Sequence, residues 1–225
     1  MVTVSNKSFN SGIKLSFMTF VLIFLIKTPI HAQFQPSGVV KLVEGYGIII
    51  RNGTEINIQK KGTVIKNGDL IRTNVPGKII LTLLEGDDFF IAPDTEIKFK
   101  EKKGLSNIIN RNLTLKGRLL AKIRKNLSRP IQIRTPNAIV AVKGTEFVTE
   151  FIQGITNIGT IKGLVSMTSI VNNKSVELKE GTMSSVNIEG EVMPPSEFSG
   201  KLMQDFEFAG DKMSEEDAAG KKIKL

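Results

Sequence analysis

Apolar and polar residues alternate with a period of two along most of the chain between residues 38 and 188. This period is typical of strands that bury one face, and the apolar spacing of helices is nearly absent there. Turn residues such as Asn52-Gly53 and Gly86-Asp87 separate the runs. Strands are predicted at residues 39–43, 47–51, 55–59, 79–84, 89–91, 95–99, 112–115, 119–123, 131–134, 139–142, 146–151, 156–161, 164–168, 175–178 and 184–188. The pattern predicts an all-β fold of many short strands.

A unit of one strand and a glycine turn recurs at residues 40–45, 81–86, 113–117 and 176–181. Such recurrence is typical of the stacked rungs of a β-solenoid. No fixed period separates the units, and strand–glycine–strand segments also occur in ordinary β-proteins. A sandwich, a roll and a β-solenoid therefore all stay open.

The N-terminus has the layout of a secretory signal peptide. Lys7 and Lys14 precede an apolar run at residues 15–26, which is followed by Pro29 and the small residue Ala32. The run is shorter than the ~20 residues of a spanning helix. We therefore predict a signal peptide at residues 1–32, export to the periplasm or cell envelope, and no membrane span after cleavage. An uncleaved N-terminal anchor is the alternative.

The β pattern ends near Pro194-Pro195, so we predict one β domain at residues 33–193 and a tail at residues 194–225. The tail is rich in charged residues, and Leu202, Met203 and Phe206 share helical spacing. A short amphipathic helix docked on the sheet would use this spacing. A disordered tail is the alternative.

The composition removes most catalytic chemistry. The chain has no Cys, and its one His, His31, lies in the predicted signal peptide. Zinc sites of the usual kind, cysteine nucleophiles and histidine bases are thereby excluded from the mature chain. Four carboxylates near a turn could supply oxygen ligands for calcium: Glu85, Asp87, Asp88 and Asp94. Their spacing fits no EF-hand loop, and Gly86-Asp87 is typical of a hairpin turn. We predict a protein that is no enzyme and has no cofactor or metal.

The formal net charge is +9, and basic residues crowd into one stretch. Between residues 98 and 134 the only acid is Glu101, against Lys98, Lys100, Lys102, Lys103, Arg111, Lys116, Arg118, Lys122, Arg124, Lys125, Arg129 and Arg134. Strand alternation predicts an anion-binding face made of Lys98, Lys100, Arg118, Lys122 and Arg124, suited to an anionic envelope polymer or lipid. A merely solvated face is the alternative. Nucleic acid is not expected, because the chain has no Trp and one Tyr.

The segment at residues 135–151 carries the most specific pattern. Pro136 and Asn137 predict a turn that leads into a strand. Gly144 then interrupts the alternation between Val142 and Phe147, as a bulge glycine does. We therefore expect a positive φ or tight packing at Gly144.

This segment resembles the hallmark of the FecR domain, a bacterial envelope module with the pattern T-P-x-A-x-V-x-V-x-G-T-x-F. The matching residues are Thr135, Pro136, Ala138, Val140, Val142, Gly144, Thr145 and Phe147. Weaker pieces match at residues 68–73, 81–83, 163–165 and 178–181, so the resemblance extends over about residues 38–188. It implies a β fold and an envelope compartment more than a reaction.

The resemblance leaves two functions open. One is a non-enzymatic binding or scaffolding module of the cell envelope, whose partner is an envelope protein or an anionic polymer or lipid. The other follows from the best-known members of the family, which resemble sensors that hold a sigma factor and receive a signal from a transporter. Only about 14 residues precede the apolar run, so a periplasmic role in such a pathway is expected rather than direct sigma-factor binding. The sequence indicates no oligomeric state.

Overall fold

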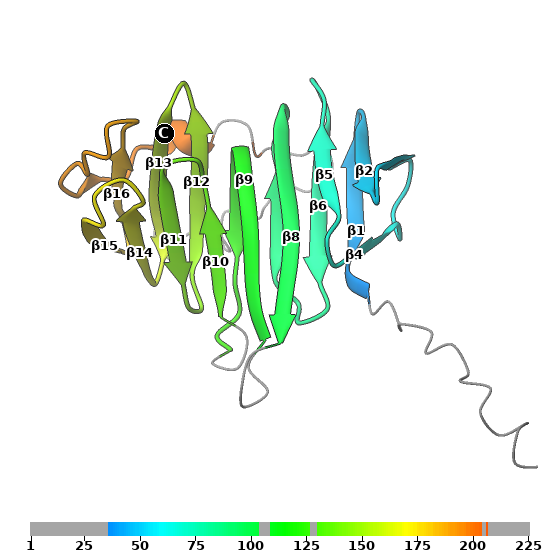
Figure 1. Cartoon of the computed structure of the whole chain (residues 1–225), viewed down its shortest axis with the longest axis horizontal. Helices are drawn as coiled ribbons and strands as arrows, with labels where there is room; N and C mark the ends of the chain where they lie inside the picture. Colours follow the sequence, from blue (N-terminus) through cyan, green and yellow to red (C-terminus); the bar gives the residue numbers. More distant parts are fainter. Residues whose placement is uncertain (1–35, 104–108, 127–129, 204–205, 207–225) are drawn as a thin grey trace, which may run out of the picture. The chain divides into compact units, whose positions relative to one another are not determined.

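The strands form two layers that pack face to face, and one strand belongs to both (Figure 1). The structure is a computed structural model that describes residues 36–103, 109–126, 130–203 and 206. These residues lie within one compact unit, Gln35–Leu225. The 17 strands of the described residues are joined by hydrogen bonds into one continuous sheet, which folds over on itself. The predicted signal peptide and Arg129 lie outside the described residues.

We call the two layers sheet A and sheet B. Sheet A has the order β4 (Val64–Lys66), β1 (Pro36–Glu44), β6 (Lys78–Leu83), β7 (Asp88–Ile91), β9 (Ile109–Lys122), β12 (Glu146–Ile152), β13 (Ile155–Lys162), β16 (Thr182–Val186) and β17 (Ser196–Glu197). Sheet B has the order β3 (Thr54–Asn57), β2 (Gly47–Arg51), β5 (Leu70–Thr73), β8 (Thr95–Lys103), β9 again, β10 (Ile131–Arg134), β11 (Ala138–Val142), β14 (Leu164–Ser169) and β15 (Ser175–Lys179). Neighbouring strands are antiparallel except β9 and β10, which are parallel.

Strand β9 changes layer at Gly117. Its first half, residues 109–116, pairs with β8 and β10 in sheet B, and its second half pairs with β7 and β12 in sheet A. Gly117 has a φ of 102°, and a Cβ atom at this position would lie 2.7 Å from the Asp94 carbonyl oxygen. Only glycine fits this corner without strain. The predicted strands at residues 112–115 and 119–123 are therefore one strand, folded over at a glycine.

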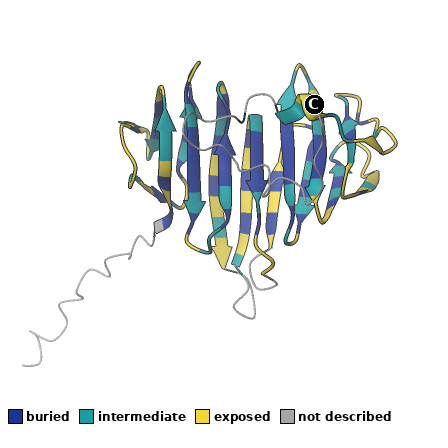
Figure 2. Ribbon diagram, turned by 180° about the vertical axis from the view of Figure 1, so that it is seen from behind, coloured by how far each residue is buried: buried dark blue, intermediate teal, exposed yellow. Residues whose placement is uncertain are grey.

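The main core lies between the layers. Leu113 and Leu115 point into it from the first half of β9, and Leu119 and Ala121 point into it from the second half. The layers also meet through an edge-to-face ring contact between Phe89 and Phe99, with ring centroids 5.9 Å apart. Figure 2 shows buried residues along the central strands and exposed residues at the turns.

A second, smaller core covers the outer face of sheet A. Ile80, Phe90, Leu120 and Val148 form an apolar strip across four neighbouring strands. The strip is covered by Phe198, Leu202, Met203 and Phe206. The predicted amphipathic segment thus docks on the sheet, but as the 3-10 helix η3 (Gly200–Met203) rather than as an α-helix. Residues 204–205 and 207–225 of the predicted tail lie outside the described residues.

The all-β prediction is confirmed, and the observed architecture is a two-layer sandwich. Strands β4 and β5 were not predicted, although β5 lies well inside sheet B between β2 and β8. Strand β5 has only four residues and follows a turn directly, so the alternation of apolar and polar residues is too short to predict a strand. Within the described part of the chain, no helix has the length and apolar content to cross a membrane.

Candidate functional site

The turn between β10 and β11 ties the two layers together through Asn137. The Asn137 side chain is 4% exposed. Its Nδ2 group donates to three carbonyl oxygens: Gly154 at 2.9 Å, Val186 at 2.9 Å and Asn187 at 3.0 Å. Gly154 lies in the β12–β13 turn and Val186 ends β16, so one amide of the sheet B turn holds two elements of sheet A.

Two buried threonines complete this network. The Thr156 hydroxyl donates to Asn137 Oδ1, and the Thr135 and Thr156 hydroxyl oxygens lie 2.7 Å apart. Thr135 Oγ1 also accepts from the Ala138 amide at 3.0 Å, which closes the turn. The motif residues at this turn are therefore structural. Sequence reasoning assigned Asn137 only a turn role, because its acceptors follow it by 17 to 50 residues.

The rest of the motif behaves as the alternation predicts. Val140, Val142 and Phe147 point into the main core. Gly144 has a φ of 66°, and a Cβ atom there would lie 2.8 Å from Lys125 Cβ. Both expectations for Gly144, a positive φ and tight packing, are confirmed.

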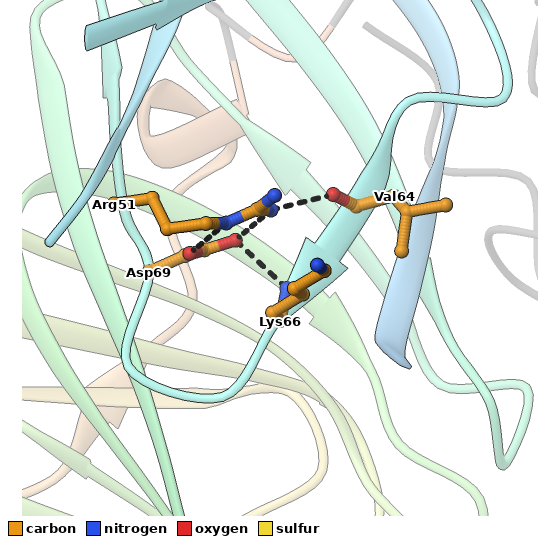
Figure 3. A network of polar contacts seen from close by, with 4 residues as sticks. All are labelled: Arg51, Val64, Lys66 and Asp69. Carbon is orange, nitrogen blue, oxygen red and sulfur yellow. Dashed lines mark hydrogen bonds and ion pairs between the residues drawn. The ribbon is translucent and has the colours of Figure 1, made fainter. Parts of the chain in front are cut away.

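Asp69 organises a second structural network near the end of β2 (Figure 3). Arg51 donates to it from Nε at 2.8 Å and from Nη2 at 2.6 Å, and the Lys66 amide donates at 2.7 Å. Arg51 Nη2 also donates to the Val64 carbonyl at 2.9 Å. The hydrogen bonds to Asp69 raise the pKa of Arg51 above its ordinary value. Asp69 is 1% exposed, so the pair holds the β2, β4 and β5 ends together.

The four carboxylates weighed as calcium ligands do not form one cluster, because Glu85 and Asp87 contact Arg111 while Asp88 pairs with Lys41. The Asp87 carboxylate accepts hydrogen bonds from the buried Arg111 guanidinium and, at 2.7 Å, from the Arg124 backbone amide. The Glu85 carboxylate lies 3.5 Å from Arg111 Nη1. Asp88 pairs with Lys41 at 2.9 Å, and Asp94 lies in the turn after β7. No group of three potential ligands that could hold a metal ion occurs among the described residues.

The predicted single basic face is wrong, because the structure divides its residues between the two layers. Lys98 and Lys100 lie exposed on the outer face of sheet B. Arg118 and Lys122 lie on the outer face of sheet A, where they pair with Glu150 at 3.1 Å and Glu146 at 3.4 Å. Arg124 follows β9 and is exposed. Even-numbered residues of β9 point away from the main core throughout the strand. Before Gly117 they lie on the outer face of sheet B, and after it they lie on the outer face of sheet A.

A cleft of about 850 Å³ opens where β9 changes layer. Its lining combines charged and apolar side chains: Arg72, Asp94, Glu96, Lys116, Arg118, Val75, Pro93, Phe151 and Ile152, with Thr73, Asn74, Thr95, Gly117 and Gln153. Arg72 donates to Glu96 at 2.7 Å. Val75 and Tyr46 are each 74% exposed, and their loops are joined by the Asn74 amide, which donates to the Tyr46 carbonyl at 3.2 Å. The cleft therefore has an apolar, exposed rim beside fixed charges, and sequence reasoning did not find it.

Comparisons with known proteins fit this geometry. Two crystal structures, at 1.65 Å and 2.50 Å resolution, of a candidate anti-sigma factor from Parabacteroides distasonis ATCC 8503 resemble this chain, with TM-scores of 0.52 and 0.51. The identities are 19% and 18%, and each match covers 60% of this chain and 62% of the other. At these identities the likeness concerns the fold, and it spans less than two thirds of either protein. No curated protein matches the chain.

The family comparison covers part of each network described above. Residues 69–166 match the model of the family described as FecR protein. The match begins at Asp69, the centre of the Arg51 network, and includes the whole motif from Thr135 to Phe147. Residues 69–166 of the chain therefore form a FecR domain.

Proposed function

We propose that this protein is a non-enzymatic, partner-binding component of a sigma-factor signalling pathway in the bacterial envelope. The observation that carries the proposal is the FecR match, together with the fold shared with a candidate anti-sigma factor. The N-terminal pattern of a signal peptide supports the envelope location.

The chemistry of the chain supports binding rather than catalysis. The chain has no Cys, and its only His precedes the β domain. Arg72 and Glu96 in the cleft neutralise each other, and Arg118 is paired with Glu150. Such paired groups suit recognition of a surface better than transfer of a proton.

The cleft is the part of the described surface that best suits a protein partner. Tyr and Arg are enriched at interface centres. Here Arg72 and Arg118 line the cleft, and Tyr46 belongs to a loop joined to the rim through the Asn74 amide. Exposed Val75 adds an apolar contact at the rim. A folded partner or a loop of one would bury these side chains together.

Site-specific crosslinking in the native bacterium tests the proposal. A photo-crosslinking residue in place of Val75 should capture a sigma-factor regulator or an outer-membrane transporter, identified by mass spectrometry. The same residue in place of Lys60, which is exposed in a turn away from the cleft lining, is the matched control and should not capture it. Deletion of the gene should also change the transcripts of one sigma-dependent regulon. Unchanged transcripts and no captured protein at position 75 would contradict the proposal.

A further inference from the structure

The outer face of sheet B presents an ordered set of polar side chains over its three central strands. Six outward residues of β8, β9 and β10 are all exposed: Lys98, Lys100, Asn112, Thr114, Gln132 and Arg134. The strand register arranges them in two rows, Lys98–Thr114–Arg134 and Lys100–Asn112–Gln132. These strands lie side by side in the layer that faces the viewer of Figure 1.

Positive charge on this face is not neutralised by nearby acids. Within the described residues, Lys98, Lys100 and Arg134 make no ion pair, and the outward acid of β8, Glu96, is bound by Arg72 at 2.7 Å. On sheet A, by contrast, Lys41, Arg118 and Lys122 are paired with Asp88, Glu150 and Glu146. The two outer faces therefore differ in charge, and sheet B is the basic one.

The spacing of the groups suits an extended anionic chain. Neighbouring strands lie ~4.8 Å apart, so the Lys98 and Arg134 backbones are separated by about 10 Å with Thr114 between them. In the first row a hydroxyl thus lies between two cations, and in the second row two amides lie beside one cation. None of the six side chains is aromatic or aliphatic, so these rows offer nothing for insertion between lipid chains.

We propose that these two rows bind an anionic polysaccharide that lies across β8, β9 and β10. Lys98, Lys100 and Arg134 contact its carboxylate or phosphate groups, and the hydroxyl and amide side chains between them hydrogen-bond its sugar hydroxyls. None of the six residues lines the cleft, although Glu96 and Lys116 of the cleft lie next to the row Lys98–Thr114–Arg134. The proposal does not depend on the proposed signalling function.

Binding to polygalacturonate, with neutral dextran as the comparison polymer, tests the charged part of the site. Wild-type protein should bind polygalacturonate at low salt, more weakly at physiological salt, and dextran not at all. The triple variant Lys98→Gln/Lys100→Gln/Arg134→Gln should lose about tenfold or more in affinity, because three screened charge contacts are removed. The matched control Lys60→Gln/Lys61→Gln/Lys162→Gln removes the same charge from exposed positions elsewhere and should bind nearly as well as wild type. Both variants should keep the wild-type melting temperature.

A second variant separates a polysaccharide from other anionic surfaces. Asn112→Ala/Thr114→Val keeps every charge but removes two groups that hydrogen-bond sugars, so its affinity for polygalacturonate should fall severalfold. Its adsorption to phosphatidylglycerol vesicles should not change. Failure of wild type to bind polygalacturonate at low salt, equal binding by wild type and the Lys98 triple variant, or tighter binding to vesicles than to the polymer would overturn the proposal.

Discussion

Asn137 joins the two layers through its side-chain amide. The amide nitrogen donates to three backbone carbonyl oxygens, and the amide oxygen accepts from the Thr156 hydroxyl. Only an amide presents donors and an acceptor in this arrangement. Asparagine also suits a tight turn, and both demands are met by the same residue. The network explains why the motif places Thr135 and Ala138 on either side of the turn.

We expect Asn137→Asp to destabilise the protein by about 3 kcal/mol, although the shape of the side chain is unchanged. The new oxygen would face the three carbonyl oxygens, and a buried group would lose its partners. Denaturant unfolding of wild type and variant measures the loss. Asn57→Asp, at an exposed position, is the control and should change the free energy of unfolding by about 0.5 kcal/mol or less. Equal losses at both positions would contradict the role given to Asn137.

Gly144 is expected to tolerate no β-branched residue. Gly144→Val combines a φ of 66° with a Cβ contact of 2.8 Å to Lys125, and should cost more than ~1 kcal/mol. Gly53 is the matched control, since its φ is 80° but no atom lies within 4 Å of a Cβ there. Thermal melts should show a larger loss for Gly144→Val than for Gly53→Val. A Gly144→Val protein that melts at the wild-type temperature would contradict the account.

Glu101 should make stability depend on pH. Burial raises the pKa of Glu101 above its ordinary 4.5, and the charge of Arg111 only partly opposes this. The folded state therefore holds the proton more tightly, so the contribution of Glu101 to stability is greatest below pH 4.5 and is lost as the pH rises through the raised pKa. Glu101→Gln should be more stable than wild type at pH 7 and equal to it at acidic pH. Thermal melts across this range measure the difference, and a constant difference at all pH values would contradict it.

At the scale of elements, β9 explains what the sequence could and could not predict. Leu113, Leu115, Leu119 and Ala121 keep one alternation through Gly117, so strand formation and the inward face were predictable from local pattern. The change of layer was not predictable, because the outward residues of both sheets of a sandwich are polar and give the same alternating pattern in the sequence. The separation of Lys98 from Lys122 depends on which strands pair, and pairing is set by contacts distant in sequence.

The segment that follows β17 and covers the outer face of sheet A supplies the next prediction. Phe206 is 4% exposed and packs on the apolar strip of sheet A. Phe206→Ala should therefore cost about 3 kcal/mol. Leu84→Ala, at a side chain that is 59% exposed, is the control and should cost about 0.5 kcal/mol or less. Denaturant unfolding compares the two, and a neutral Phe206→Ala variant would contradict the packing of this segment.

For the molecule as a whole, sharing of β9 predicts one cooperative unfolding transition. Strand β9 is central to both sheets: its first half pairs with β8 and β10 in sheet B, and its second half pairs with β7 and β12 in sheet A. If β9 leaves one sheet, the other sheet therefore loses hydrogen bonds as well. Far-ultraviolet circular dichroism should show a single denaturant transition, and the calorimetric and van't Hoff enthalpies of thermal unfolding should agree. Two separated transitions would mean that the sheets unfold independently.

The fold at Gly117 also has a mechanical consequence. Packed helices in many proteins respond to ligands by sliding past each other in shear, and the two layers of a sandwich could slide in the same way. Here such sliding would bend β9 at its corner and pull on its hydrogen bonds in both layers, and the Asn137 amide resists it at a second point. A load applied to one layer is therefore carried by the other, so the domain transmits force as a stiff body rather than by internal rearrangement.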